Sequence, residues 1–211
     1  MSQPQPQTQT QKKSTPATQA KKHETQNNEP SKTLFLDRDG VVNVDHGYVS
    51  QPKDFEFIDG VFTACKQFQD AGYKIVIITN QSGIGRGYYS EQDFHALTDW
   101  MVAEFKKNNV DILAVYYCPH HPVKANAPYL QECDCRKPQP GMLLQAINQH
   151  NLSPNNSIMI GDKASDMQAA SAAGIKHKYL VNSGQSFSSE VEELADAVFA
   201  DLPAAANSIL L

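Results

Sequence analysis

Short apolar runs, which predict strands, alternate along the chain with stretches in which apolar residues recur every three or four positions. The run at residues 74–78 is dominated by β-branched apolar side chains, as expected for a central parallel strand that is covered on both faces. The predicted strands are residues 34–36, 74–78, 112–117, 157–160 and 179–181, with an additional edge strand at 198–199.

Four helices are predicted between these strands. The first begins at Val61 and stops at Gly72, because glycine commonly ends a helix. The second begins at an S-x-x-D capping signature formed by Ser90 and Asp93, and Pro140 opens the third. The fourth covers residues 165–173 and ends at Gly174. In the third helix we expect Leu143, Leu144 and Ile147 to be buried. The apolar residues at helical spacing in the first two helices are Ala64, Cys65, Phe68 and Ala71 in the first, and Phe94, Leu97, Met101, Val102 and Phe105 in the second.

This alternation predicts an α/β fold with a doubly wound, mostly parallel sheet and right-handed crossovers. In such folds ligands bind beyond the carboxyl ends of the strands. Polar clusters follow three of the predicted strands, at residues 37–39, 79–82 and 162–166. We therefore expect one functional site at this edge of the sheet.

The composition fits a globular domain with a core of its own. The chain has 211 residues, of which 40% are hydrophobic and 19% are charged. The net charge of −5 argues against a nucleic-acid partner held by a basic surface, and no apolar run approaches the roughly 18 residues that span a bilayer. We expect a monomer that acts on a small molecule, with no nucleic-acid partner and no membrane partner.

The first thirty residues differ in composition from the rest. They hold seven Gln and only three apolar residues, Met1, Ala17 and Ala20. Such a segment buries too little surface to offset its ordering entropy, so we predict a disordered tail at residues 1–30 and a folded domain at residues 31–211. The apolar region of a signal peptide is missing from this stretch, so we expect a cytoplasmic protein.

Two carboxylates stand two residues apart at the end of the first predicted strand. In extended backbone Asp37 and Asp39 project to the same side, with Arg38 turned aside, and Gly40 allows a sharp turn. Neighbouring carboxylates repel, and a hard divalent cation such as Mg²⁺ relieves that repulsion. Asp162 follows another strand and would add a third oxygen ligand. The D-x-D-G pattern alone also fits an Asp-Gly turn or a calcium loop.

Three cysteines and a histidine have the spacing of a second metal site. Cys118-x-His120 and Cys133-x-Cys135 form two ligand pairs that a loop separates. Three thiolates and an imidazole are the ligand set of a structural zinc, and the alternative is buried or redox-active cysteines. Spacing alone does not separate His120 from His121. Zinc would order this loop and fix the direction of the two cations that follow Cys135, which are Arg136 and Lys137.

Four motifs taken in order along the chain resemble those of the haloacid-dehalogenase (HAD) superfamily. The resemblance covers about residues 33 to 203 and implies a Rossmann-like domain. No insertion between the motifs is long enough for a large cap domain, so we expect the zinc loop to form a wall of the site. The motifs are Asp37-x-Asp39-Gly40, Thr79-Asn80, Lys137, and Gly161-Asp162 with Asp166.

The resemblance also implies a role for each motif residue. Asp37 would attack phosphorus and form an aspartyl-phosphate, while Asp39 would act as general acid and then as general base. Thr79, the backbone of Asn80, and Lys137 would stabilise the transferring oxygens. The Mg²⁺ ligands would be the carboxylates of Asp37 and Asp162 and the backbone carbonyl of Asp39. Asp166 would orient Lys137 or a metal-bound water, or cap the following helix, and Lys163 would reach a phosphate or balance local charge.

Within the superfamily, the chain is similar to a subgroup that contains the D-glycero-D-manno-heptose-1,7-bisphosphate 7-phosphatases and the histidinol-phosphate phosphatases. The stretches at residues 45–49 and 55–60 most resemble the heptose enzymes, which act in lipopolysaccharide core biosynthesis. A non-catalytic zinc-binding scaffold is an alternative of another class. The substrate contacts that the resemblance implies are Asp45, His46, Gly47, Tyr48, Thr79, Asn80, Gln81, Ser82, Arg136, Lys137 and Lys163, with Arg136 gripping the phosphate that is not removed.

Overall fold

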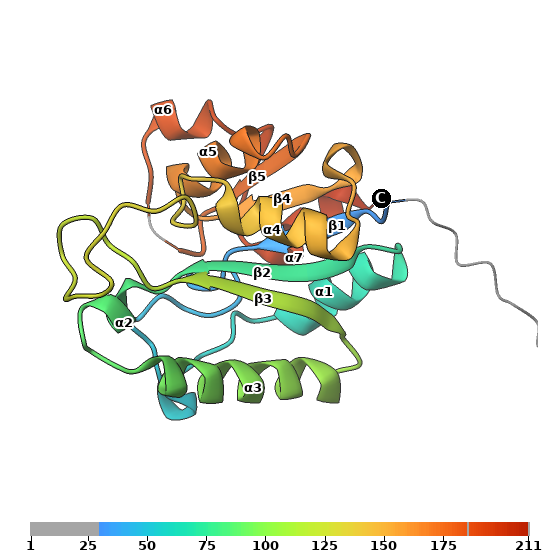
Figure 1. The fold of residues 1–211 in the computed structure, drawn as a ribbon. Helices are drawn as coiled ribbons and strands as arrows, with labels where there is room; N and C mark the ends of the chain where they lie inside the picture. The colour runs from blue at the N-terminus through green and yellow to red at the C-terminus, as the bar shows by residue number, and fades with distance from the viewer. Residues whose placement is uncertain (1–29, 185, 211) are drawn as a thin grey trace, which may run out of the picture.

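A single parallel sheet organises the computed structural model, which describes residues 30–184 and 186–210. Six strands lie in the order β3-β2-β1-β4-β5-β6, so the predicted doubly wound sheet is confirmed (Figure 1). The predicted disorder of the tail falls almost wholly on residues outside this description. The strands are β1 (Thr33–Leu36), β2 (Lys74–Asn80), β3 (Ile112–Cys118), β4 (Ile158–Gly161), β5 (His177–Val181) and β6 (Ala197–Phe199).

The central strands are the most apolar segments of the chain. All four residues of β1 are buried, and Ile75 to Ile78 of β2 have no exposed surface. β1 pairs with β2 on one side and with β4 on the other, so that Leu36 lies opposite both Ile77 and Ile160. Because these parallel strands end in register, the polar residues that follow them meet at one edge of the sheet.

Helices cover both faces of the sheet (Figure 1). The helices α1 (Val61–Asp70), α3 (Glu91–Lys107) and α7 (Leu202–Ile209) contribute to the core on one face, and α4 (Gly141–His150) and α5 (Ala164–Ala172) contribute to the core on the other. The short elements are η1 (Pro52–Asp54), α2 (Ser82–Gly85), η2 (Pro154–Asn156) and α6 (Ser189–Glu192).

In the third predicted helix, one residue that we expected to be buried is exposed. Leu144 is 40% exposed, whereas Met142, Leu143 and Ala146 are buried. Three apolar residues in succession cannot all face the sheet, because each step turns the helix by about 100°. Pro140 is the residue that precedes the helix rather than its first member.

The connection from β3 to α4, residues 119–140, projects beyond the carboxyl edge of the sheet near α2 (Figure 1). This segment carries most of the predicted zinc ligands, and no large cap domain is inserted between the described elements. In residues 30–184 and 186–210, no helix has the length and apolar character needed to cross a bilayer.

Candidate functional site

Three buried carboxylates from two strand ends meet at the carboxyl edge of the sheet. Asp37 follows β1, Asp162 follows β4, and Asp166 lies in the first turn of α5. One oxygen from each of the three lies within 4.8 Å of those from the other two, which is close enough to hold one metal ion. An all-oxygen donor set of this kind fits a hard divalent cation.

Lys137 joins this cluster from the segment before α4. Its ammonium nitrogen lies 2.9 Å from Asp37 Oδ1 and 2.5 Å from Asp166 Oδ1, and it donates a hydrogen bond to the carbonyl of Ile78 at 2.8 Å. Asn80 at the end of β2 fixes the backbone of Lys137 through two hydrogen bonds of 3.1 Å each. The sheet therefore positions a lysine that is distant in sequence.

Burial and like charge shift the ionisation of these carboxyls. The pKa of Asp37 is raised to about 7, mainly by burial; the charge of Lys137 opposes this rise, and the charges of Asp166 and Asp162 add to it. Burial also raises the pKa of Asp162. Burial alone would lower the pKa of Lys137, but Asp166 and Asp37 raise it. The cluster thus carries more buried negative charge than Lys137 neutralises, which a divalent cation would correct.

Asp39 lies apart from the three clustered carboxylates. We predicted that Arg38 would turn aside, and this is wrong, because the buried guanidinium folds back onto Asp39 with Nη2 at 2.9 and 3.0 Å from its two oxygens. Asn43 and Gln81 also donate to this carboxylate at 3.1 Å. Burial would raise the pKa of Asp39, but Arg38, Asn43 and Gln81 together bring it below its ordinary value.

A polar pocket of about 250 Å³ opens beside this carboxylate. Lys163 lies 3.3 Å from Asp162 and 3.4 Å from Asp45, and so links the carboxylate cluster to the loop after β1. Burial would lower the pKa of Lys163, but Asp162, Asp37 and Asp45 raise it. The pocket is lined by Asp39, Asp45, Gly47, Tyr48, Asn80, Gln81, Ser82, Gly83, Tyr89 and Lys163.

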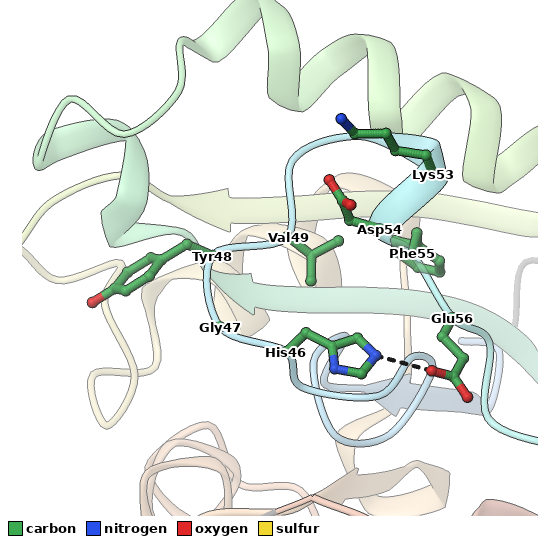
Figure 2. Close-up of a pocket in the computed structure, with 8 residues that line it drawn as sticks. All are labelled: His46, Gly47, Tyr48, Val49, Lys53, Asp54, Phe55 and Glu56. Carbon is green, nitrogen blue, oxygen red and sulfur yellow. Dashed lines mark hydrogen bonds and ion pairs between the residues drawn. The ribbon is translucent and has the colours of Figure 1, made fainter.

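A neighbouring hollow of about 450 Å³ shares only Gly47 and Tyr48 with the polar pocket. His46 lines this hollow, where its Nε2 lies 2.9 Å from Glu56 Oε2 (Figure 2). The ring of Tyr48 points away from that pair (Figure 2). His46 is therefore absent from the lining of the polar pocket, although its neighbours Gly47 and Tyr48 line both hollows.

The four predicted zinc ligands form a second compact cluster at the end of β3. The sulfur atoms of Cys118, Cys133 and Cys135 lie 3.1 to 3.5 Å apart, and His120 Nδ1 lies 3.4 Å from Cys135 Sγ and 3.6 Å from Cys118 Sγ. Tetrahedral zinc with bonds of about 2.3 Å to sulfur separates its ligand atoms by about 3.5 to 3.8 Å, which these distances approach from below. Three thiolates and one imidazole this close together fit a structural zinc. His121 Nδ1 instead accepts hydrogen bonds from the backbone of residues 123 and 124.

Comparisons with known proteins agree with this geometry. A family model described as "HAD-hyrolase-like" matches residues 134–205. A protein from Haemophilus ducreyi is 51% identical over 172 residues, which is 81% of this chain and 94% of the relative. A protein from Escherichia coli K12 is 49% identical over 175 residues, covering 82% of this chain and 92% of the relative. Both relatives are named D-glycero-beta-D-manno-heptose-1,7-bisphosphate 7-phosphatase.

The chain belongs to this heptose-bisphosphate phosphatase family of HAD-like hydrolases. A solved structure of D,D-heptose 1,7-bisphosphate phosphatase from B. bronchiseptica is also similar, with a TM-score of 0.73 and 30% identity over 85% of this chain and 98% of that one. That protein was crystallised with magnesium and phosphate.

The family motifs left the role of Asp166 open between orienting Lys137 or a metal-bound water and capping the following helix. Its Oδ1 pairs with Lys137, while its Oδ2 accepts a hydrogen bond from the backbone of Lys163 at 3.0 Å. The side chain therefore orients the lysine and caps the start of α5 at once.

Three residues near the site belong to none of the motifs and were missed by sequence reasoning. Asn43 donates to Asp39, and the hydroxyl of Tyr89 donates to Gln81 Oε1 at 2.5 Å. Arg86 comes four residues after Ser82, the last predicted substrate contact of the 79–82 cluster, and its guanidinium lies 5.6 Å from the centre of the Tyr48 ring. Its closeness to that cluster in the sequence is the only signal that could have identified it.

Proposed function

We propose that the protein is a Mg²⁺-dependent phosphatase that removes the C7 phosphate of D-glycero-D-manno-heptose 1,7-bisphosphate. The product, heptose 1-phosphate, serves nucleotide-heptose and lipopolysaccharide core biosynthesis. The observation that carries the proposal is the identity of about half the sequence with relatives of this activity, together with the Asp37–Lys137–Asp166 arrangement. The names of those relatives favour the β anomer.

Asp37 is the nucleophile in this proposal. Its oxygen attacks phosphorus to form an aspartyl-phosphate while the bond to the sugar oxygen breaks, and water then hydrolyses the intermediate. Mg²⁺ would be held by the carboxylates of Asp37 and Asp162 and the backbone carbonyl of Asp39, and it would neutralise charge between the attacking carboxylate and the phosphate. The raised pKa of Asp37 supports a cation there, because attack requires the ionised carboxylate.

Asp39 handles the protons of both steps. It gives a proton to the leaving sugar oxygen and takes one from the water that attacks the aspartyl-phosphate. Its contacts with Arg38, Asn43 and Gln81 favour the carboxylate form, which is the form that accepts the proton of the second step. Asp39 also lines the polar pocket, which supports this role if the sugar binds there.

The remaining residues bind and orient the substrate. Lys137 and Thr79 stabilise the transferring oxygens, with the Thr79 hydroxyl fixed by a 2.8 Å hydrogen bond from Gln81. The sugar would lie against the pocket wall. Substrate contacts are proposed for Asp45, His46, Gly47, Tyr48, Asn80, Gln81, Ser82, Arg136 and Lys163, of which Asp45, Gly47, Tyr48, Asn80, Gln81, Ser82 and Lys163 line the polar pocket.

Zinc at Cys118, His120, Cys133 and Cys135 would stabilise the 119–140 segment. Burial raises the pKa of the Cys118 thiol, so a bound cation is what would keep that sulfur ionised. Arg136 donates a hydrogen bond to the carbonyl of His120 at 3.2 Å, so a metal that holds His120 in place would also hold the Arg136 side chain.

We extend the proposal to the whole chain. It consists of a tail at residues 1–30 and one phosphatase domain at residues 31–211. It acts as a monomer in the cytoplasm on a small sugar phosphate. This is supported by the two ligand clusters and the polar pocket, which form from residues of one chain, and by the described cysteines, which form no disulfide, as in a reducing compartment.

The test compares phosphate release from heptose 1,7-bisphosphate and from histidinol phosphate in the presence of Mg²⁺, with Asp37→Asn as the inactive control. We expect the kcat/KM for phosphate release from the bisphosphate to be at least about a hundredfold higher than that for histidinol phosphate. Preferred release from histidinol phosphate would assign the protein to the other activity of the subgroup. Release from neither substrate would contradict a phosphatase function and leave a zinc-binding scaffold.

A further inference from the structure

Gln81 joins two residues of the proposed mechanism through its side-chain amide. Its Nε2 donates hydrogen bonds to Asp39 Oδ2 at 3.1 Å and to Thr79 Oγ1 at 2.8 Å. Its backbone nitrogen is also fixed, because it donates to the carbonyl of Cys118 at 2.8 Å. Since only 3% of Gln81 is exposed, the direction in which its amide faces depends mainly on partners within the protein.

The oxygen of this amide accepts a hydrogen bond from the hydroxyl of Tyr89 at 2.5 Å. The oxygen and the nitrogen of a glutamine amide are alike in size, so their hydrogen-bond partners decide which way the amide faces. With Oε1 bonded to Tyr89, Nε2 faces Thr79 and Asp39. The Tyr89 hydroxyl therefore opposes a rotation of the Gln81 amide away from these two residues.

The direction of these bonds leaves the hydroxyl hydrogen of Thr79 for the substrate. Because Gln81 Nε2 donates to Thr79 Oγ1, the threonine oxygen is the acceptor of that bond. Its own hydrogen can then be donated to a transferring phosphoryl oxygen, as the proposed mechanism requires. A rotated amide would present Oε1 to this hydroxyl and accept the hydrogen instead. The orientation that Tyr89 supports is thus the one that the reaction needs.

The ring of Tyr89 packs against the backbone of α2. A Cβ atom on Gly83 would collide with this ring and would lie 2.8 Å from its hydroxyl oxygen. The chain turns back over α2 through a hydrogen bond of 2.9 Å from the backbone nitrogen of Tyr88 to the carbonyl of Gly83. The absence of a side chain at residue 83 therefore allows the Tyr89 hydroxyl to reach Gln81.

The Tyr89 hydroxyl remains a hydrogen-bond donor at neutral pH. Burial raises the pKa of Tyr89 to about 12, with the charge of Arg38 opposing this rise and the charge of Asp39 adding to it. Tyr89 and Gln81 both line the polar pocket, so their hydrogen bond lies at its wall. Without the hydroxyl, Gln81 Oε1 would turn toward water or sugar in the pocket, and Nε2 would turn with it.

We propose that Tyr89 is a positioning residue, whose hydroxyl holds the Gln81 amide in the orientation that serves both Thr79 and Asp39. The inference rests on the proposed function, because that function gives Thr79 and Asp39 their roles. Tyr89 acts through Gln81 and not by contact with the reacting atoms. Its effect is on the alignment of groups in the transition state, where a displacement of about 1 Å is enough to lower the rate.

The test is a double-mutant cycle that measures kcat/KM for heptose 1,7-bisphosphate with Mg²⁺ present. Tyr89→Phe keeps the ring and removes only the hydroxyl, and it is expected to lower kcat/KM about tenfold. Gln81→Met keeps the length of the side chain without the amide and is expected to lower kcat/KM by at least about tenfold. In the double variant, Tyr89→Phe is expected to add less than about twofold to the loss from Gln81→Met, because no amide is left for the hydroxyl to position. A merely structural role of Tyr89 would make the two losses multiply.

Tyr88→Phe is the matched control, because it removes the same hydroxyl from the adjacent residue. Tyr88 is 61% exposed and meets Tyr48 through its ring, which the substitution keeps, so kcat/KM is expected to stay within about twofold of wild type. An unchanged kcat/KM in Tyr89→Phe, an equal fall in Tyr88→Phe, or losses that multiply in the double variant would overturn the proposal. Should Tyr89→Phe not fold, Gly83→Ala displaces the ring instead, and its combination with Gln81→Met decides in the same way.

The proposed function stands independently of this inference. Wild-type enzyme that releases phosphate from the bisphosphate, with Tyr89→Phe equally active, would overturn the role of Tyr89 alone. Wild-type enzyme that releases no phosphate from the bisphosphate would overturn the proposed function, and the role of Tyr89 with it.

Discussion

Asp37 is a buried acid whose ionisation opposes folding unless a cation is bound. An acid whose folded pKa exceeds its unfolded value binds more protons when folded, so the free energy of unfolding falls as pH rises between the two values. For Asp37 the pKa is 3.8 in the unfolded chain and about 7 in the folded protein. The metal-free protein therefore loses stability from Asp37 as pH rises through this window.

Replacement of this acid by its amide should separate stability from catalysis. Asp37→Asn is expected to abolish turnover and, without metal, to raise the unfolding temperature above wild type by a margin that is larger near pH 7.5 than near pH 5. Saturating Mg²⁺ is expected to stabilise the wild type more than the variant, since the amide lacks the charge that binds the cation. Thermal unfolding at both pH values measures this, with Asp99→Asn on the exposed side of α3 as the control.

A margin that does not depend on pH would show that Asp37 is already ionised in the metal-free protein. Turnover by Asp37→Asn would instead remove the nucleophile from the proposed mechanism.

Arg38 couples the proposed acid to the loop that lines the polar pocket. The same Nη2 that bonds Asp39 donates to the carbonyl of Val49 at 3.2 Å, and the guanidinium lies 5.8 Å from the centre of the Phe55 ring. One buried nitrogen thus fixes both the carboxylate that we propose as the acid and the end of the segment that carries Gly47 and Tyr48.

The effect of removing this guanidinium should depend on the leaving group. Arg38→Lys is expected to lower kcat for heptose bisphosphate about tenfold, because a single ammonium cannot hold Asp39 and Val49 together. The fall with p-nitrophenyl phosphate is expected to be smaller, since p-nitrophenolate leaves without a proton. Parallel kcat measurements decide the question, and equal losses on both substrates would mean that Arg38 acts on the fold and not on Asp39.

At the scale of elements, strands were easier to predict than helices. All six predicted strands form, because continuous β-branched runs such as that of β2 are buried on both faces. The helix α3 begins at the predicted capping box of Ser90 and Asp93. By contrast, α7 was missed, since its run of alanines lacks the alternation of large apolar and polar residues that marks an amphipathic helix.

The 119–140 segment is the element whose order depends most on side-chain chemistry. It has no helix or strand of its own, and the cysteine–histidine cluster joins its two ends. Cys133→Ser is expected to lower zinc content and the unfolding temperature together, and to raise KM through loss of order at Arg136 and Lys137. Metal analysis, thermal unfolding and steady-state kinetics on the same preparation measure the three effects.

His120 and His121 provide a matched pair for this element. His120→Asn should reproduce the loss of zinc, whereas His121→Asn should retain it, because only the His120 ring lies in the cluster. Zinc loss without any change in stability or KM would show that the metal does not order the segment.

At the scale of the molecule, the positions of the site residues follow from strand register. Asp37, Thr79 and Asp162 could be predicted because each stands at the carboxyl end of a parallel strand. The pairing of Arg38 with Asp39 could not be predicted, because it depends on side-chain rotamers and on a loop path that the packing of distant segments determines.

Two glycines from distant parts of the chain enclose Asp162, and this packing yields the last prediction. A Cβ atom on Gly184 would collide with the carboxylate of Asp162, and one on Gly40 would lie 2.5 Å from its Oδ2. Gly184→Ala is therefore expected to displace Asp162 and to weaken Mg²⁺ binding at least about tenfold, measured by the Mg²⁺-dependent shift in unfolding temperature. Ser183→Ala removes only the 2.8 Å hydrogen bond to the carbonyl of Gly40 and adds no atom, so its Mg²⁺ affinity should stay within about threefold of wild type. Zinc content should be unchanged in both variants, and equal Mg²⁺ affinity in Gly184→Ala and Ser183→Ala would show that the two glycines do not set the position of Asp162.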